Sequence, residues 1–338
     1  MLYGNPSLKY PYKRQRVQGT YSSQERAHLL SLTLALPFTL ALPFTLALSH
    51  GCVSVNLEDQ APQGGARGDV AGGDCVGCEA AQGDAGPMTV TLNTPPCGQR
   101  CPRIDWILVP AGQYTVGNPL NPRESPARAL SLEAFFISRS EVTVGQYLAC
   151  VDAGVCAPSS CEGFEQDEGV LTCNERERRR DHPVNFITWE QAITFATWVG
   201  ASLPSEAQWE AAAAGAERRI YAWGDDPPSC ERADFLDCHG GGTSPACLLD
   251  GWTPLGICDL SGNLWEWTLD EHHDSYEGAP PNGAPWCEGD CDAPSTARRV
   301  LRGGGWGAMP ELLRTSNRYS LSPNEPSKIV GFRLVQRP

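Results

Sequence analysis

The stretch Gly262-Asn-Leu-Trp-Glu-Trp267 belongs to a series of short motifs that decides the fold of this chain. It lies within residues 216–298, a segment in which Gly, Pro, Asp and Cys recur throughout. The whole chain has 338 residues, of which 35 are Gly, 28 are Pro and 10 are Trp. Such a content of Gly and Pro favours loops and turns over long helices. We therefore expect residues 216–298 to be mostly loop.

Regular elements are expected on both sides of this loop segment. Three helices should begin at capping boxes, in which a Ser or Thr is followed three residues later by Gln. The three pairs are Thr143 with Gln146, Thr188 with Gln191, and Ser205 with Gln208. The third helix should end at Gly215, because Gly is the usual residue just after a helix. Short strands are expected within residues 106–117, 133–139, 300–305 and 331–335.

The cysteine content indicates an oxidising compartment, because 15 cysteines are far too many for an ordinary cytosolic enzyme. Ten of them could form five disulfides that staple a loop-rich core. These ten are Cys150, Cys156, Cys161, Cys173, Cys230, Cys238, Cys247, Cys258, Cys287 and Cys291. The sequence does not decide how they pair. The spacings Cys75/Cys78 and Cys97/Cys101 predict disulfide clips, with a metal ribbon as the alternative.

The first 52 residues have the pattern of an export segment. A basic stretch, residues 1–28, is followed by 20 residues without a charge, Leu29 to Leu48. The sequence then reaches Cys52 after a small residue, which resembles a bacterial lipoprotein cleavage site with Cys52 as the lipidated residue. Plain secretion and an uncleaved membrane anchor are the alternatives. We therefore expect a lipid-anchored or secreted protein of the cell envelope, periplasm or extracellular space, which contacts the membrane through a lipid anchor only.

The rest of the chain divides by composition into two parts. Residues 53–103 are rich in Gly, Ala, Gln and Asp and are expected to form a flexible tether that carries Cys pairs. Residues 104–338 should form one folded domain. The formal net charge of −14 excludes nucleic acid as a partner, because neutralising phosphates requires Lys and Arg.

The order of the motifs resembles the formylglycine-generating enzyme family, also called the sulfatase-modifying factors. The eight motifs occupy residues 110–117, 140–147, 182–189, 203–210, 221–225, 262–267, 302–306 and 331–333. The resemblance covers about residues 104–337. It implies an α+β domain with the C-type-lectin-like fold of that family, which agrees with the loop-rich, disulfide-stapled core expected above.

The resemblance implies the fold but does not carry over the activity. Active members oxidise a cysteine of a client sulfatase to Cα-formylglycine, using oxygen and copper(I) held by two cysteines. The corresponding positions here are Ala308 and Leu313, and Gly305 stands in place of a family Ser. Copper(I) needs soft thiolate ligands, so a copper site is not expected. Cys287 and Cys291 would be the rearranged alternative. Other branches use a His-rich iron site, whose His pattern is absent here.

Calcium is the metal that the resemblance does imply. The family's structural calcium loop corresponds to Asp259, Gly262, Leu264 and Glu266, where two carboxylates and two backbone carbonyls would supply hard oxygen ligands. A second family site would begin at Asp234-Phe235. A plain tight turn is the alternative. Residues Glu271 to Asp274 could also hold a metal, with a solvated loop as the alternative.

The resemblance also implies a substrate groove. The positions that correspond to it are Arg302, Gly305, Trp306, Asn317 and Arg318, with ordinary packing or hydrogen bonding as the alternative. The missing thiolates favour a non-catalytic binding or accessory protein whose partner is an extended peptide, a glycan or an envelope protein. An oxidase acting on a cysteine of a client sulfatase is the alternative.

Overall fold

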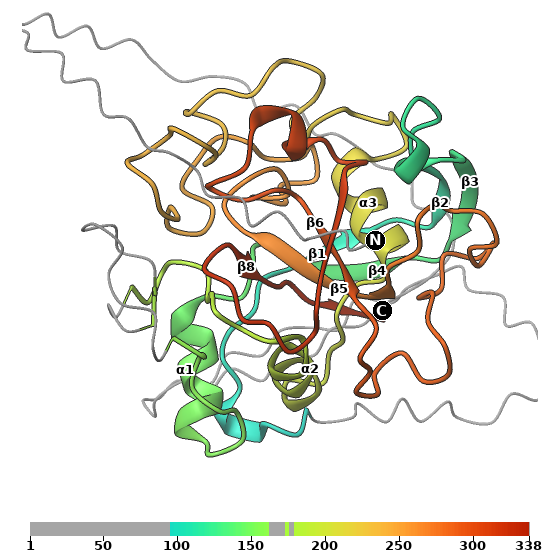
Figure 1. The fold of residues 1–338 in the computed structure, drawn as a ribbon. Helices are drawn as coiled ribbons and strands as arrows, with labels where there is room; N and C mark the ends of the chain where they lie inside the picture. Colours follow the sequence, from blue (N-terminus) through green and yellow to red (C-terminus); the bar gives the residue numbers. More distant parts are fainter. Residues whose placement is uncertain (1–94, 162–172, 176–178, 338) are drawn as a thin grey trace, which may run out of the picture. The chain divides into compact units, whose positions relative to one another are not determined.

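Strand β5 (Trp265–Glu271) lies at the centre of the larger sheet of the computed structural model (Figure 1). The structure describes residues 95–161, 173–175 and 179–337. β5 pairs antiparallel with β6 (Arg299–Arg302) and parallel with β8 (Val330–Gly331). β7 (Arg318–Leu321) pairs with the other edge of β6. β5 is the one helix or strand within residues 216–298, so the expectation that this segment is mostly loop is confirmed, although the strand itself was not predicted.

Both faces of β5 are covered, because successive side chains of a strand point to opposite faces. Its apolar side chains belong to the same core as helices α1 (Val144–Asp152) and α2 (Trp189–Trp198). Its acidic side chains bind helix α3 (Glu206–Ala214) instead. In Figure 1, α1 and α2 lie below β5 and α3 lies above it. This arrangement explains how a fully buried strand can carry three carboxylates.

The three helices begin where the capping boxes predict. Each cap hydroxyl accepts a hydrogen bond from the backbone amide three residues later, and the Gln side chain accepts one from the cap residue's own amide. α3 ends at Gly215, whose φ of 65° lies in the left-handed region. Among the described residues, no helix combines the length and apolarity needed to cross a membrane.

The remaining strands form two smaller sheets. β4 (Phe135–Ser138) lies between β1 (Trp106–Val109) and β9 (Val335–Gln336). β2 (Gly112–Val116) pairs with β3 (Arg128–Leu132). Strands β1 and β2 are consecutive but belong to different sheets, and α3 packs with both sheets in a second core. Short 3-10 helices occupy Gly98–Arg100, Pro122–Glu124 and Pro310–Leu313.

Twelve cysteines lie in the described residues and all twelve form disulfides. The pairs are Cys97–Cys101, Cys150–Cys156, Cys161–Cys173, Cys230–Cys238, Cys247–Cys258 and Cys287–Cys291. The ten cysteines expected to form five disulfides do so, and Cys287 and Cys291 bond to each other. Disulfides in this number are typical of an oxidising environment.

The folded part begins before Ile104. Cys97 is buried in the core with α2, and its amide donates to the carbonyl of Trp198. The expected export segment (residues 1–52), the proposed lipidation site Cys52 and the pair Cys75/Cys78 lie outside the described residues.

Candidate functional site

Four carboxyl groups surround the loop that leads into β5. Glu141, Asp234 and Glu266 are fully buried, and Asp259 is partly buried. They come from three parts of the chain: the residues before α1, the loop after α3, and the segment that runs from the following loop into β5. The pKa values of Glu141 and Asp259 are raised first by burial and then by other members of this group. We call these four residues the acidic cluster.

Asn263 connects two members of the acidic cluster, Glu141 and Asp234. Its side-chain Nδ2 donates to Glu141 Oε2 at 2.8 Å, and its backbone amide donates to the carbonyl of Asp234 at 2.9 Å. The amide of Leu264 donates to Glu141 Oε1 at 3.0 Å. The neighbouring position 262 requires glycine, because a Cβ there would lie 2.6 Å from the carbonyl oxygen of Asp234. The two expected calcium segments, 234–235 and 259–266, therefore meet in one place.

The buried charge of the acidic cluster is only partly balanced. Arg333 donates to Glu266 at 2.6 and 2.8 Å, and Trp209 Nε1 donates to the same carboxylate at 2.8 Å. One guanidinium thus faces four carboxyl groups. Burial raises the pKa of Asp259 to about 6, and it also raises the pKa of Asp234 and brings that of Glu141 well above its usual range. Buried carboxylates that lack enough counter-charge are costly unless a cation joins them.

Asp234 supplies the atom that most needs a partner. Its side chain is fully buried, and Oδ2 accepts from Ser244 Oγ at 2.6 Å. Oδ1 has no hydrogen-bond partner among the described residues, and the nearest ring nitrogen of His239 lies 3.4 Å away. An orphaned carboxylate oxygen beside further carboxylates and a bent backbone has the chemistry of a calcium site. Glu266, in contrast, already uses both oxygens for Arg333 and Trp209.

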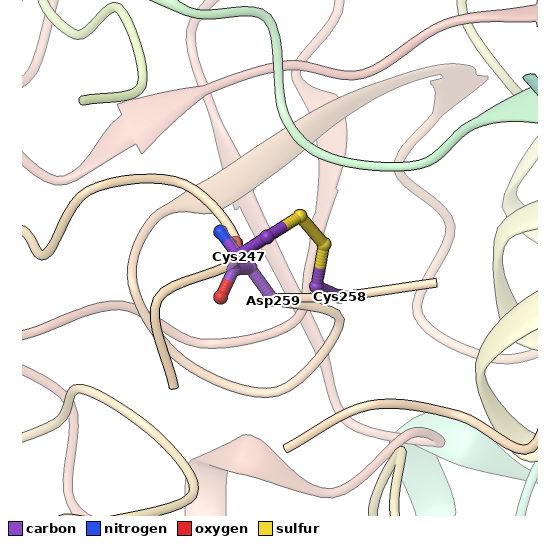
Figure 2. Close-up of side chains that lie close together, drawn as sticks. All are labelled: Cys247, Cys258 and Asp259. Carbon is purple, nitrogen blue, oxygen red and sulfur yellow. A yellow bond between two sulfur atoms is a disulfide. The ribbon is translucent and has the colours of Figure 1, made fainter. Parts of the chain in front are cut away.

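Asp259 lies next to the Cys247–Cys258 disulfide and accepts a hydrogen bond from one of its two cysteines. Figure 2 shows its carboxylate beside the Cys247–Cys258 bond. The amide of Cys247 donates to Asp259 Oδ2 at 2.7 Å. Both sulfur atoms and a carboxylate oxygen lie within 4.8 Å of one another. In the disulfide form, however, only the carboxylate can bind a metal ion, because a cysteine binds metals as a free thiolate.

The expected groove arginines have internal partners. Arg302 is fully buried, where it donates to Glu210 and to the carbonyls of residues 315–317. Arg318 donates to both oxygens of Glu206 at 2.6 and 2.9 Å, and its guanidinium lies 4.2 Å from the ring centre of Tyr276. These contacts join β6 and β7 to α3. Both arginines therefore have a structural role, and the groove role that the resemblance implies for them stays a prediction.

The other expected groove residues lie around the same strands. Asn317 donates to the carbonyl of Leu312 at 3.0 Å. Gly305 is buried against the backbone of Trp265. Trp306 is partly buried, donates to the carbonyl of Lys328 at 3.3 Å, and has the Lys328 amine over its ring.

Residues 93–338 match the family described as the sulfatase-modifying factor enzyme 1-like domain. The chain belongs to this family. The family resemblance inferred from the eight motifs is thereby confirmed.

Proteins similar to this chain are named for several different activities. The chain is 28% identical to the serine/threonine-protein kinase Pkn1 of Chlamydia trachomatis, over 76% of this chain and 44% of the kinase. It therefore spans less than half the length of that relative. It is 26% identical to the formylglycine-generating enzyme of Bos taurus, over 82% of this chain and 89% of the enzyme. It is 31% identical to the hercynine oxygenase of Mycolicibacterium thermoresistibile, over 63% of this chain and 53% of that protein.

A solved structure supports the fold of the sulfatase-modifying factor domain. PvdO from Pseudomonas aeruginosa superposes with a TM-score of 0.59 and 25% identity, covering 72% of this chain and 97% of PvdO. The expected α+β, loop-rich and disulfide-stapled fold of the family is thereby confirmed.

Ala308 and Leu313 lie together in a small apolar core of the sulfatase-modifying factor domain. This core also contains Ala233, Phe235 and Cys238. Leu313 is fully buried and Ala308 nearly so. The side chain of Phe235, which was expected to belong to a second calcium site, packs in this core, and the calcium site itself stays a prediction.

A cleft of about 930 Å³ lies at the far end of β5, away from the acidic cluster. Glu271, His272 and His273 line it, together with residues of the loop that carries Cys287–Cys291. His273 stacks on Trp286 with ring centres 3.6 Å apart. Within the described residues, Cys247, Cys258 and Asp259 form the one group of three convergent metal-binding side chains, so Glu271 to Asp274 do not form another.

The pH dependence of stability should depend on Asp270, whose carboxylate accepts from the amides of Glu206 and Trp286. Burial, and then the charge of Glu206, raises the pKa of Asp270 from 3.8 to about 7. The folded chain therefore keeps a proton that the unfolded chain releases. The free energy of unfolding should fall by about 1.4 kcal/mol per pH unit as the pH rises from about 4 to about 7.

Asp270→Asn should remove this contribution, because the amide carries no titrating proton. Urea unfolding of both proteins across this pH range measures it. The same difference in stability between the two proteins at every pH would contradict the assignment.

Proposed function

We propose that this chain is a non-catalytic member of its family, an accessory protein that binds an extended peptide outside the cytoplasm. The observation that carries the proposal is the state of its cysteines. All twelve described cysteines are in disulfides, and no cysteine follows Cys291. The number of disulfides also supports an extracytoplasmic location.

The side chains present do not fit copper(I). The resemblance assigns the two copper thiolates to the positions of Ala308 and Leu313, and both side chains pack in an apolar core. Cys287 and Cys291, the rearranged alternative, are bonded to each other. Hydrocarbon side chains cannot replace soft sulfur ligands. We therefore assign no redox step to this domain.

The surface next to these positions favours a peptide partner. The amide of Leu236 donates to the carbonyl of Ala308 at 2.9 Å, so Leu236 lies beside the 308–309 segment. Leu236 is 44% exposed and the neighbouring Met309 is 53% exposed. These two exposed side chains offer apolar area that a partner can bury. An extended peptide can bury such side chains, and Met adapts well to irregular partners.

The alternative function is the oxidation of a cysteine in a client sulfatase. The similarity to the formylglycine-generating enzyme of Bos taurus, over 89% of that enzyme, is the observation that favours it.

A client-peptide assay separates the two functions. The full chain with added copper(I) and oxygen should convert no detectable cysteine of a sulfatase-derived peptide to formylglycine, measured by mass spectrometry. An active formylglycine-generating enzyme serves as the positive control. Turnover by this chain would refute the non-catalytic proposal. Peptide binding without turnover, weakened by Met309→Asp, would support it.

Calcium is proposed as a structural ion of this domain. Asp234, with its orphaned oxygen, and Asp259 would supply carboxylates, and the carbonyls of Gly262 and Leu264 would supply further oxygens. The ion would supply positive charge to the acidic cluster, which has one guanidinium for four carboxyl groups. Glu266, satisfied by Arg333, would then act by holding the loop.

Removing calcium should destabilise the protein. With free calcium at about a hundred times its Kd, the bound ion stabilises the folded state by about 2.7 kcal/mol. For a domain of this size EDTA should then lower Tm by roughly 5–10 °C. Differential scanning calorimetry measures the shift. In Asp234→Asn, which lacks one proposed calcium ligand, EDTA should leave Tm unchanged. An unchanged Tm of the wild-type protein in EDTA would refute the calcium proposal.

A further inference from the structure

The Cys247–Cys258 disulfide brings three metal-binding groups together. Both sulfur atoms and an oxygen of Asp259 lie within 4.8 Å of one another (Figure 2). The Cα atoms of the two cysteines are 5.2 Å apart. None of the other five disulfides in the described residues has a third metal-binding side chain within this range. Two thiolates and a carboxylate, with sulfur about 2.3 Å from the metal, are suitable ligands for zinc.

The surrounding backbone keeps these groups in place without the sulfur–sulfur bond. The amide of Cys258 donates to the carbonyl of Arg139 at 2.9 Å, and its own carbonyl accepts from Arg333 at 2.9 Å. On the other side, the amide of Cys247 donates to Asp259 at 2.7 Å. These bonds do not depend on the oxidation state of the sulfurs. The loop is therefore pre-organised to present two thiols after reduction.

The two cysteines of this pair differ in their exposure to solvent. Cys258 is buried, whereas Cys247 is partly exposed and offers the sulfur that a reductant reaches first.

We propose that Cys247, Cys258 and Asp259 form a thiol-controlled zinc site, which is closed as a disulfide and opens on reduction by a dithiol. One thiolate of the dithiol attacks Cys247 Sγ, the bond between the cysteines breaks, and Cys258 leaves as a thiolate. The second thiolate of the reductant then releases Cys247, so that the reductant becomes a disulfide and supplies two electrons. Zn²⁺ then binds both sulfurs and the Asp259 carboxylate. This site does not require the proposed calcium ion.

Cobalt(II) tests the proposal, because it replaces zinc and gives a sulfur-to-metal charge-transfer absorption. The full chain is treated with limiting dithiothreitol, and alkylation with mass mapping identifies the opened disulfide. The reduced protein should bind one equivalent of Co²⁺ with this absorption, and Zn²⁺ should abolish it. The oxidised protein should show no such absorption. A reduced wild-type protein without the absorption would overturn the proposal.

Variants identify the ligands. Cys287→Ser/Cys291→Ser, which removes another short disulfide, should keep the absorption after reduction. Cys247→Ser/Cys258→Ser should lose it, and Asp259→Asn should weaken Co²⁺ binding at least tenfold. An absorption that persists in Cys247→Ser/Cys258→Ser would assign the metal to other cysteines and refute the site. The oxidised and reduced wild-type proteins provide the same test if a variant fails to fold. Calcium binding by the oxidised protein is measured separately, so either proposal can fail alone.

Discussion

Arg333→Leu should lower the free energy of unfolding by about 3–5 kcal/mol, which is the usual cost of removing one partner of a buried ion pair. Arg333 and Glu266 are both fully buried, and the guanidinium forms two hydrogen bonds with the carboxylate. Arg333 is also the guanidinium that balances the acidic cluster. Its loss would leave Glu266 and its acidic neighbours without that counter-charge. Denaturant unfolding followed by Trp fluorescence measures the change.

Two further variants make this result interpretable. Arg333→Lys keeps the charge but loses the planar two-pronged contact, so it should recover only part of the stability. Arg103→Leu removes an ion pair with Asp105 in which the two side chains are 90% and 51% exposed. This control should change stability by less than about 1 kcal/mol. A loss of the same small size in Arg333→Leu would show that the acidic cluster does not depend on this guanidinium.

Arg318→Met should also cost about 3–5 kcal/mol, because it leaves the carboxylate of Glu206 buried without its main partner. Arg318 donates to both oxygens of Glu206 and also to the carbonyls of Arg123 and His273. Burial lowers the pKa of Arg318, but the charge of Glu206 outweighs this and the pKa lies above its usual value. Met keeps much of the side-chain volume, so the loss should come from the ion pair.

The same variant separates the two interpretations of Arg318. A structural role predicts a lower midpoint of denaturation and unchanged affinity of the folded fraction for a bound peptide. A groove role predicts the reverse, with weaker peptide binding at normal stability. Arg232→Met is the matched control, because the ion pair of Arg232 with Asp226 is well exposed. It should leave both quantities nearly unchanged.

Local signals in the sequence were the most reliable. A capping box involves two residues three positions apart, so Thr188 and Gln191 could predict the start of α2 without knowledge of the rest of the fold. Strand β5 was missed for the opposite reason. Its acidic residues resemble loop residues until their distant partners are known, as when Asp270 accepts from the amide of Glu206, 64 residues away in sequence.

The candidate site was only partly predictable for the same reason. The resemblance selected Asp259 and Gly262, which are close in sequence, and the structure brings Asp234 to the same loop. Glu141 was not identified, although it lies within one of the eight motifs. Its contact with Leu264 spans 123 positions, and no local pattern reveals such a contact. Likewise, only the fold shows that Arg302 and Arg318 have buried acidic partners on α3.

The disulfides described above are all short-range, with partners between 4 and 12 positions apart. During synthesis, which begins at the N-terminus, the partner of each of these cysteines follows within about a dozen residues. The sheets form later, because β4 pairs with β9 and β5 pairs with β8, and both partners lie near the C-terminus. Covalent cross-linking can therefore proceed segment by segment along the chain and be complete before the last strands pair.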